Sequence, residues 1–242
     1  MRQLLVILIL FSVLSCQNND TEFLTFGNYR GELKVSDTQK LPFVFNVKDA
    51  NTLEIYNADE VITVDEITYK NDSVYIKLPV FEGLLIAKIK DQTLNGRFVV
   101  EEKGREQAFT AYKSQTRFDN TAKAEKNITG EWETVFSPNT EADKYVAKGI
   151  FKQKENIVTG TFLTETGDYR YLEGVINGDQ LQLSTFDGAH AFLFTGTVTD
   201  STINGQFYSG NHWKEPFIAK RNANYQLASA NNLTYLKDGY DT

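Results

Sequence analysis

Hydrophobic and polar residues alternate along most of the chain from residue 26 onward. The alternation is clear at residues 74–78 (VYIKL) and 192–198 (FLFTGTV), where β-branched and aromatic residues dominate. A period of two is typical of a half-buried β-strand, and helical spacing is nearly absent. Turn-forming residues separate these segments, and pairs such as Asn95-Gly96 and Asn204-Gly205 tolerate the positive φ angles of tight hairpins. The pattern predicts an all-β chain of antiparallel hairpins.

The N-terminus departs from this pattern. Residues 4–14 are an uncharged apolar run that follows Arg2, and Ser15-Cys16 comes directly after it. The run is too short to cross a bilayer as a helix, which needs about 20 residues. The segment resembles a bacterial lipoprotein signal peptide, and this resemblance implies cleavage before Cys16 and acylation of that cysteine. The alternative is an ordinary secretory leader that happens to end in cysteine.

The body of the chain contains two similar halves. Four short segments recur in the same order, at offsets of 103, 105, 109 and 108 residues. The pairs are residues 27–29 (GNY) and 130–132 (GEW), 81–83 (FEG) and 186–188 (FDG), 94–98 (LNGRF) and 203–207 (INGQF), and 109–111 (FTA) and 217–219 (FIA). Four matches in series, with offsets that drift only by loop-sized insertions, predict a duplicated unit of about 90 residues.

Each half offers about eight strands, enough to close a small antiparallel barrel without a free edge. The segment Gly130-Glu131-Trp132 also resembles the opening of lipocalin-like barrels, so we expect two small calycin-like barrels, with two sandwiches as the alternative. The predicted organisation assigns residues 1–15 to the signal peptide and 16–25 to a polar tether. It assigns 26–117 to the first β unit, 118–128 to a linker, 129–221 to the second unit and 222–242 to a tail.

Composition narrows the classes of function. Removal of the leader leaves 24 basic and 32 acidic residues, a net charge of −8 without a basic cluster. Such a chain is a poor candidate for binding nucleic acid or anionic lipid headgroups. Cys16 is the single cysteine, so a disulfide within one chain is excluded and the core alone has to provide stability.

Few residues suggest catalysis or metal binding. The two histidines, His190 and His212, are far apart in sequence, and a zinc site is not expected. His190 alternates with Phe192 and Phe194, which predicts a half-buried histidine on a strand face. Ser209 and His212 could belong to a hydrolytic triad, but no motif supports one. We therefore predict no catalytic residue, metal or cofactor.

Two weaker groups of candidate sites remain. The residues that could line a cavity or a sugar site are Tyr29, Trp132, Tyr169, Tyr171, His190 and Trp213. Aromatic residues of an all-β protein belong more often to its core and cross-strand packing. Ser73 and Ser201 each follow an aspartate at a predicted turn, in tripeptides that resemble the O-glycosylation acceptor of exported Bacteroidetes proteins. An ordinary turn residue is the alternative at both positions.

Several features together resemble one lipoprotein family. They are the leader, residues 127–132 (NITGEW), residues 204–207 (NGQF) and residues 236–241 (LKDGYD). They look like the N-terminal region of Bacteroidetes lipoproteins that carry a C-terminal thioredoxin-like domain of the TlpA/ResA type. In that family a Cys-x-x-Cys pair performs the redox chemistry. This sequence contains no such pair, so we expect either a truncated member or a free-standing relative that has only the β region.

Three hypotheses follow. The first is a non-catalytic accessory module for thiol-disulfide oxidoreductase function, anchored in the cell envelope by its N-terminal lipid, with the outer membrane favoured. The second is an independent lipocalin-like protein that binds a small apolar ligand or a glycan. The third is a hydrolase that acts through carboxylates.

Overall fold

The computed structural model describes residues 22–79 and 83–228 and is all-β. The first unit contains β1 (Gly27–Lys34), β2 (Lys40–Val47), β3 (Leu53–Asn57), β4 (Glu60–Val64), β5 (Glu66–Lys70), β6 (Ser73–Lys77), β7 (Leu84–Lys90), β8 (Thr93–Val100), the 3₁₀ turn η1 (Glu101–Lys103) and β9 (Arg105–Lys113). The second contains β10 (Gly130–Phe136), β11 (Tyr145–Lys154), β12 (Ile157–Thr164), β13 (Leu172–Asn177), β14 (Gln180–Phe186), β15 (Ala191–Val198), β16 (Thr202–Ser209) and β17 (Trp213–Arg221). The prediction of an all-β chain of two antiparallel meanders is therefore confirmed.

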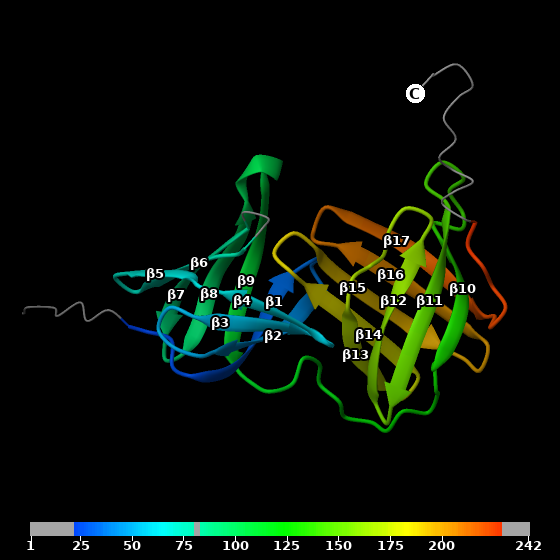
Figure 1. Cartoon of the computed structure of the whole chain (residues 1–242), viewed down its shortest axis with the longest axis horizontal. Helices are drawn as coiled ribbons and strands as arrows, with labels where there is room; N and C mark the ends of the chain where they lie inside the picture. The colour runs from blue at the N-terminus through cyan, green and yellow to red at the C-terminus, as the bar shows by residue number, and fades with distance from the viewer. Residues whose placement is uncertain (1–21, 80–82, 229–242) are drawn as a thin grey trace, which may run out of the picture.

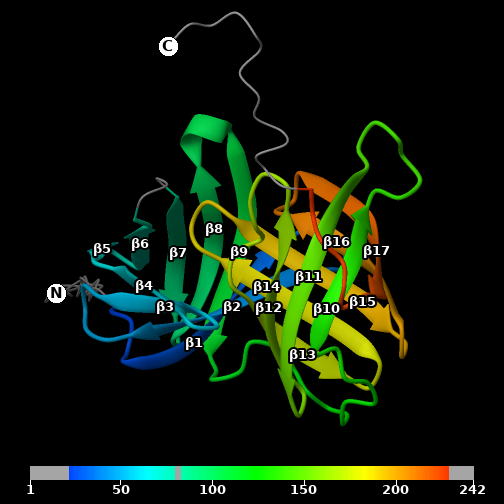
Figure 2. The ribbon, with the colours of Figure 1, turned by 45° about the vertical axis from the view of Figure 1, so that its right-hand side comes forward.

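The two units close to different extents. Strands β10 to β17 form a closed barrel, visible in Figure 2. The first unit is a nine-stranded sheet in the order β4-β3-β2-β1-β9-β8-β7-β6-β5. Its two edges, β4 and β5, are consecutive in the chain but do not pair with each other. Counted outward from the pairs β1–β9 and β10–β17, both edge strands reach the position of β13, so the first unit has one strand more than the barrel.

The matching sequence segments occupy equivalent places in the two units. Residues 27–29 begin β1 and residues 130–132 begin β10. Gly96 of β8 pairs with Phe109 of β9, and Gly205 of β16 pairs with Phe217 of β17 in the same register. The pair formed by residues 81–83 and 186–188 falls partly on residues 80–82, which lie outside the described residues. At the other three places, the same residue types lie at the same positions in the strand order.

The two units pack against each other; the sequence alone did not show whether they do. Phe186 of β14 points away from the barrel interior into the core of the first unit, and its ring centroid lies 4.3 Å from that of Phe43 and 5.1 Å from that of Phe98. Other side chains on the outer face of the barrel, including Leu193 of β15 and Tyr208 of β16, belong to the same core cluster. The barrel thereby covers part of the open first unit (Figure 1).

The connecting segments are more ordered than the sequence suggested. In the predicted linker, Phe118 and Ile128 are buried, and the backbone N–H of Ala122 donates a 2.6 Å hydrogen bond to Asn177 Oδ1 at the end of the barrel. In the predicted tether, Leu24 is only 3% exposed and belongs to the first core. The composition of residues 17–22 does predict a polar segment, but ordered packing already begins before residue 26.

Candidate functional site

The predicted ligand-lining residues do not converge on one site. Tyr29 and Trp132 are fully buried at equivalent positions of β1 and β10. Lys113 Nζ lies 4.0 Å from the centroid of the Tyr29 ring, and Arg221 Cζ lies 4.3 Å from that of Trp132. Each cation also donates hydrogen bonds to backbone carbonyls of the segment that precedes the first strand of its unit. These two aromatic residues are therefore core residues capped by a cation and do not line a cavity.

The structure corrects the expected position of His190. This residue precedes β15 in the turn after β14, and its side chain is partly exposed. Its Nδ1 lies 2.9 Å from Asp187 Oδ2, and its backbone N–H donates to Asp187 Oδ1. His190 therefore belongs to a turn held by Asp187, because the side chain of Asp187 satisfies the backbone there and ends the strand pairing.

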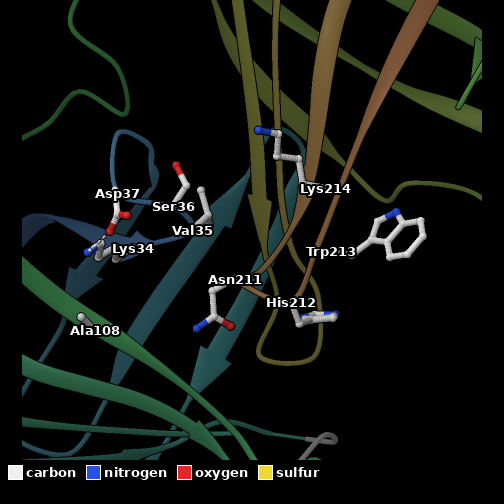
Figure 3. Close-up of a pocket in the computed structure, with 9 residues that line it drawn as sticks. All are labelled: Lys34, Val35, Ser36, Asp37, Ala108, Asn211, His212, Trp213 and Lys214. Atoms are coloured by element: carbon white, nitrogen blue, oxygen red, sulfur yellow. Dashed lines mark hydrogen bonds and ion pairs between the residues drawn. The ribbon is translucent and has the colours of Figure 1, made fainter.

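Trp213 and His212 lie at a shallow hollow of about 520 Å³ between the β1–β2 turn and the β16–β17 turn (Figure 3). Lys34 and Asp37, on the opposite side, form an ion pair of 2.8 Å with each other. Figure 3 shows the indole of Trp213 pointing away from that pair. The hollow does not bring its polar groups to a common point.

The hydrolytic triad is not assembled around His212. Ser209 Oγ lies 3.5 Å from His212 Nε2. Burial, together with the positive charges of Arg105 and Lys103, lowers the pKa of His212. Within the described part of the chain, no hydrogen bond or ion pair joins His212 to a carboxylate.

A buried cation, Arg117, lies at the junction of the two units. Its side chain is 3% exposed, and burial lowers its pKa while the nearby carboxylate of Glu173 opposes that shift. The guanidinium donates to the carbonyl of Tyr56 and to that of Pro42 (3.5 Å), both in the first unit. It also donates to the hydroxyl (3.1 Å) and carbonyl (3.4 Å) of Ser184 in the barrel. One cation thus joins β2, β3 and β14.

Neighbouring groups extend this junction. Asn57, fully buried at the end of β3, donates through Nδ2 to the carbonyl of Phe186 (2.9 Å) and accepts from the Phe186 N–H (3.1 Å). Arg170 of the β12–β13 loop bridges Glu60 of the first unit (2.6 Å) and Asp187 of the barrel (3.2 Å). Tyr171, beside it, is half exposed at a separate hollow. The junction is a polar network with hydrogen bonds and ion pairs in both units, and it fixes their relative orientation. Among the described residues, the Nε atoms of Arg117 and Arg170 are buried without a hydrogen-bond partner.

A second buried charge lies inside one end of the barrel. Glu215 of β17 is 4% exposed and points inward on the same strand face as Phe217. Its carboxylate accepts hydrogen bonds from Ser137 Oγ (2.5 Å) and Tyr145 OH (2.7 Å). Tyr145 OH is also hydrogen-bonded to Tyr169 OH. Among the described residues, no cation forms an ion pair with this carboxylate.

Tyr145 and Tyr169 join the buried carboxylate to the surface. Both line a hollow of about 430 Å³ at the barrel mouth, together with residues 164–168 at the end of β12 and in the loop after it. Burial raises the pKa of Tyr169 to about 12, and burial together with the contacts to Tyr169 and Glu215 raises that of Tyr145 still further. Both phenols therefore stay neutral at physiological pH. Glu165 and Asp168 add acidic groups to the rim, and no basic residue lines this hollow.

The barrel interior below this mouth is filled by aromatic rings. Phe194 lies between Phe162 and Phe207, with ring centroids 4.9 Å and 4.6 Å away. Phe136 and Phe217 complete the cluster, at 5.6 Å from each other. These contacts occupy the centre of the barrel, and the mouth around Tyr145 and Tyr169 offers polar groups at one end of it.

Sequence reasoning identified Tyr169 but missed its partners. Glu215 alternates with Phe217 and Ala219, so a charged residue on an apolar strand face was the available signal. Arg117 gave no such signal, because it lies in the polar segment after β9, where a basic residue is ordinarily solvated. Its burial arises only when the barrel packs on the first unit.

The predicted modification sites have separate outcomes. Ser73 begins β6 after a turn, is partly exposed and donates to Asp72 Oδ1 at 2.9 Å. Ser201 is exposed in the turn before β16. Both lie at turns as expected, and their glycosylation stays a prediction. Cys16 lies outside the described residues.

Within residues 22–79 and 83–228, no helix has the length and hydropathy that a membrane span requires. The same part of the chain contains no group of three or more His, Cys, Asp or Glu side chains arranged to hold a metal ion. No protein-family model matches the sequence, and no curated protein or solved structure is significantly similar to it.

Proposed function

We propose that this chain is a lipid-anchored, non-catalytic β module of the cell envelope, a rigid two-unit accessory to thiol-disulfide oxidoreductase function. The observation that carries the proposal is the junction around Arg117. A spacer or recognition module has to present its surfaces in a fixed arrangement, and a fully buried guanidinium with acceptors in both units opposes their independent motion.

The anchor is tested by metabolic labelling of the full chain with an alkyne fatty acid in a bacterium that processes lipoproteins. We expect label on the wild-type protein and none on Cys16→Ala. The matched control is Ser15→Ala, which leaves the cysteine in place and should still be labelled. An unlabelled wild-type protein would exclude the anchor.

The accessory role is tested by cross-linking in the native envelope followed by mass spectrometry. We expect a thioredoxin-like protein with a Cys-x-x-Cys pair to be cross-linked to the wild-type chain, at residues on its outer surface. If the cross-linked proteins contain no thiol-disulfide oxidoreductase, the accessory role is wrong, whereas the anchor is judged by the labelling alone.

A second candidate function is binding of a small ligand at the barrel mouth. The observation that favours it is the Glu215 carboxylate, which is buried without a cation among the described residues. Burial of a charge is costly unless it is compensated, and two neutral donors compensate it only in part. With Tyr145 and Tyr169 beside it, the ligand class that fits this mouth is a small organic cation, held by charge and by aromatic faces.

Choline is a suitable probe for this candidate, with isothermal titration calorimetry as the readout. We expect Glu215→Gln to bind choline roughly tenfold more weakly, because a change of about 1.4 kcal/mol in binding free energy is a factor of ten. Glu66→Gln, at an exposed ion pair on β5, is the matched control and should bind like the wild type. Equal binding of choline by all three proteins, or by none of them, would exclude this site.

A further inference from the structure

The segment that leads into β1 displays two phenylalanines on an ordered backbone. Phe23 is 51% exposed and Phe26 is 71% exposed, whereas Leu24 between them is buried. The backbone around them is held in place. Thr25 donates to Gln92 Oε1 through both its N–H and its hydroxyl (2.8 Å each), and Lys113 Nζ donates to the carbonyls of Thr25 (2.9 Å) and Phe26 (2.7 Å).

The first unit also packs against the ring of Phe23. The Phe23 ring lies 4.8 Å from that of Tyr69 on β5. Exposed apolar side chains that occur singly are ordinary on a protein surface, but these two are close in sequence on a fixed segment. The fold therefore holds them outward against the cost of hydrating two aromatic rings.

Their place in the molecule matches the position of the proposed anchor. The described chain begins at the end of the first unit that lies away from the barrel, at one end of the long axis (Figure 1). Cys16 precedes Phe23 by seven residues. Seven extended residues reach at most about 25 Å, so acyl chains on Cys16 would keep this end close to the lipid surface.

We infer that Phe23 and Phe26 form a membrane-contact surface that inserts into the bilayer interface and holds the molecule end-on, with the barrel on the side away from the lipid. The inference rests on the proposed lipid anchor. Aromatic rings favour the boundary between headgroups and acyl chains. The mature net charge of −8 gives no attraction to anionic lipids, so the contact depends on apolar insertion and should form on zwitterionic bilayers.

The test uses the full lipidated chain in phosphatidylcholine vesicles, with and without brominated acyl chains that quench tryptophan on contact. A tryptophan is placed at the surface by Phe26→Trp in a Trp213→Phe background, and Trp132 stays as a buried reference. The matched control is Ile157→Trp in the same background, because Ile157 is 50% exposed but belongs to the barrel. Both positions are exposed, so neither change should affect folding.

We expect brominated lipid to reduce the emission of the F26W protein and to leave the I157W protein unchanged. Equal quenching of both would overturn the end-on orientation. An unquenched F26W protein that still floats with the vesicles would overturn the contact while the anchor stands. A protein that does not float at all would overturn the anchor and with it this surface. Concentration-dependent self-association of an unquenched F26W protein would assign the two phenylalanines to an interface between copies of the chain.

Discussion

Replacement of Arg117 by methionine is the sharpest test of the junction between the two units. Methionine keeps most of the volume of the side chain and removes its charge and all its donors. The carbonyls of Pro42, Tyr56 and Ser184 then lose a partner in a largely buried region. The Glu173 carboxylate, 3.8 Å from Arg117 Nε, also loses its positive neighbour.

The expected loss of stability follows from these contacts. A hydrogen bond from a charged donor contributes about 1.5–3 kcal/mol, but desolvation of the guanidinium already offsets part of that sum. Removal of one partner of a buried ion pair costs about 3–5 kcal/mol. We expect this range for R117M, and an intermediate loss for Arg117→Lys, whose ammonium reaches fewer acceptors than a planar guanidinium.

Equilibrium unfolding in urea measures the effect, with tryptophan fluorescence reporting on the barrel and far-UV circular dichroism reporting on both units. We expect the two signals of the wild type to change in one coincident transition. For R117M we expect the two transitions to separate, because the first unit is no longer hydrogen-bonded to the barrel through Arg117. Arg97→Met is the matched control: Arg97 lies in an exposed pair, 3.7 Å from Glu106, worth at most about 1 kcal/mol. If R117M and R97M lose the same free energy and both unfold in one transition, the junction does not join the units as argued.

Three further changes test other parts of the structure. Gly205→Ala would place a Cβ 2.4 Å from the Phe217 ring and should lower the free energy of unfolding in urea by about 1–3 kcal/mol. Gly167→Ala is the control, because a Cβ at Gly167 meets nothing within 4 Å. Equal losses of stability in the two variants would refute the packing argument. Burial alone would raise the pKa of Asp187, but the hydrogen bonds from His190 outweigh burial and lower that pKa. The ionised carboxylate therefore stabilises the fold above its unfolded pKa of about 4. This stabilisation is lost as the pH falls through the lower pKa of the folded state. The difference in unfolding free energy between the wild type and Asp187→Asn should therefore shrink below about pH 4, and a difference independent of pH from 2 to 7 would contradict the assignment. Tyr145→Phe removes a donor to a buried carboxylate and should cost about 1–3 kcal/mol by thermal denaturation, and a change below about 0.5 kcal/mol would show that the contact is dispensable.

The sequence was most informative where one local rule decides the outcome. Alternation with a period of two correctly predicted the strands. The hairpin turns expected at Asn95-Gly96 and Asn204-Gly205 are wrong, because both pairs lie inside strands β8 and β16. Gly96 and Gly205 have no positive φ there, and each lies so close to neighbouring atoms that a Cβ would clash. His190 shows the limit of the same rule. Its alternation with Phe192 suggested a strand, but the carboxylate of Asp187 accepts two backbone N–H hydrogen bonds and holds a turn instead.

The candidate site was only partly predictable for a similar reason. Tyr169 could be selected as an aromatic residue, but its hydrogen-bond partner Tyr145 comes from β11. Glu215, the acceptor of Tyr145, comes from β17. Long-range contacts of this kind leave no periodic signal in the sequence, because each partner fits the alternation of its own strand and nothing in that alternation indicates the other.

By itself, the sequence determined the all-β class, the order of the hairpins and the doubled pattern, since these depend on side-chain periodicity and turn chemistry within a few residues. Only the tertiary structure decided that one unit closes into a barrel while the other keeps two free edges, and that the two pack together. Those outcomes depend on which strands meet and on whether buried groups such as Arg117 and Glu215 find partners. The cost of burying such a group and the hydrogen bonds that offset this cost depend on contacts between segments that are distant in the chain.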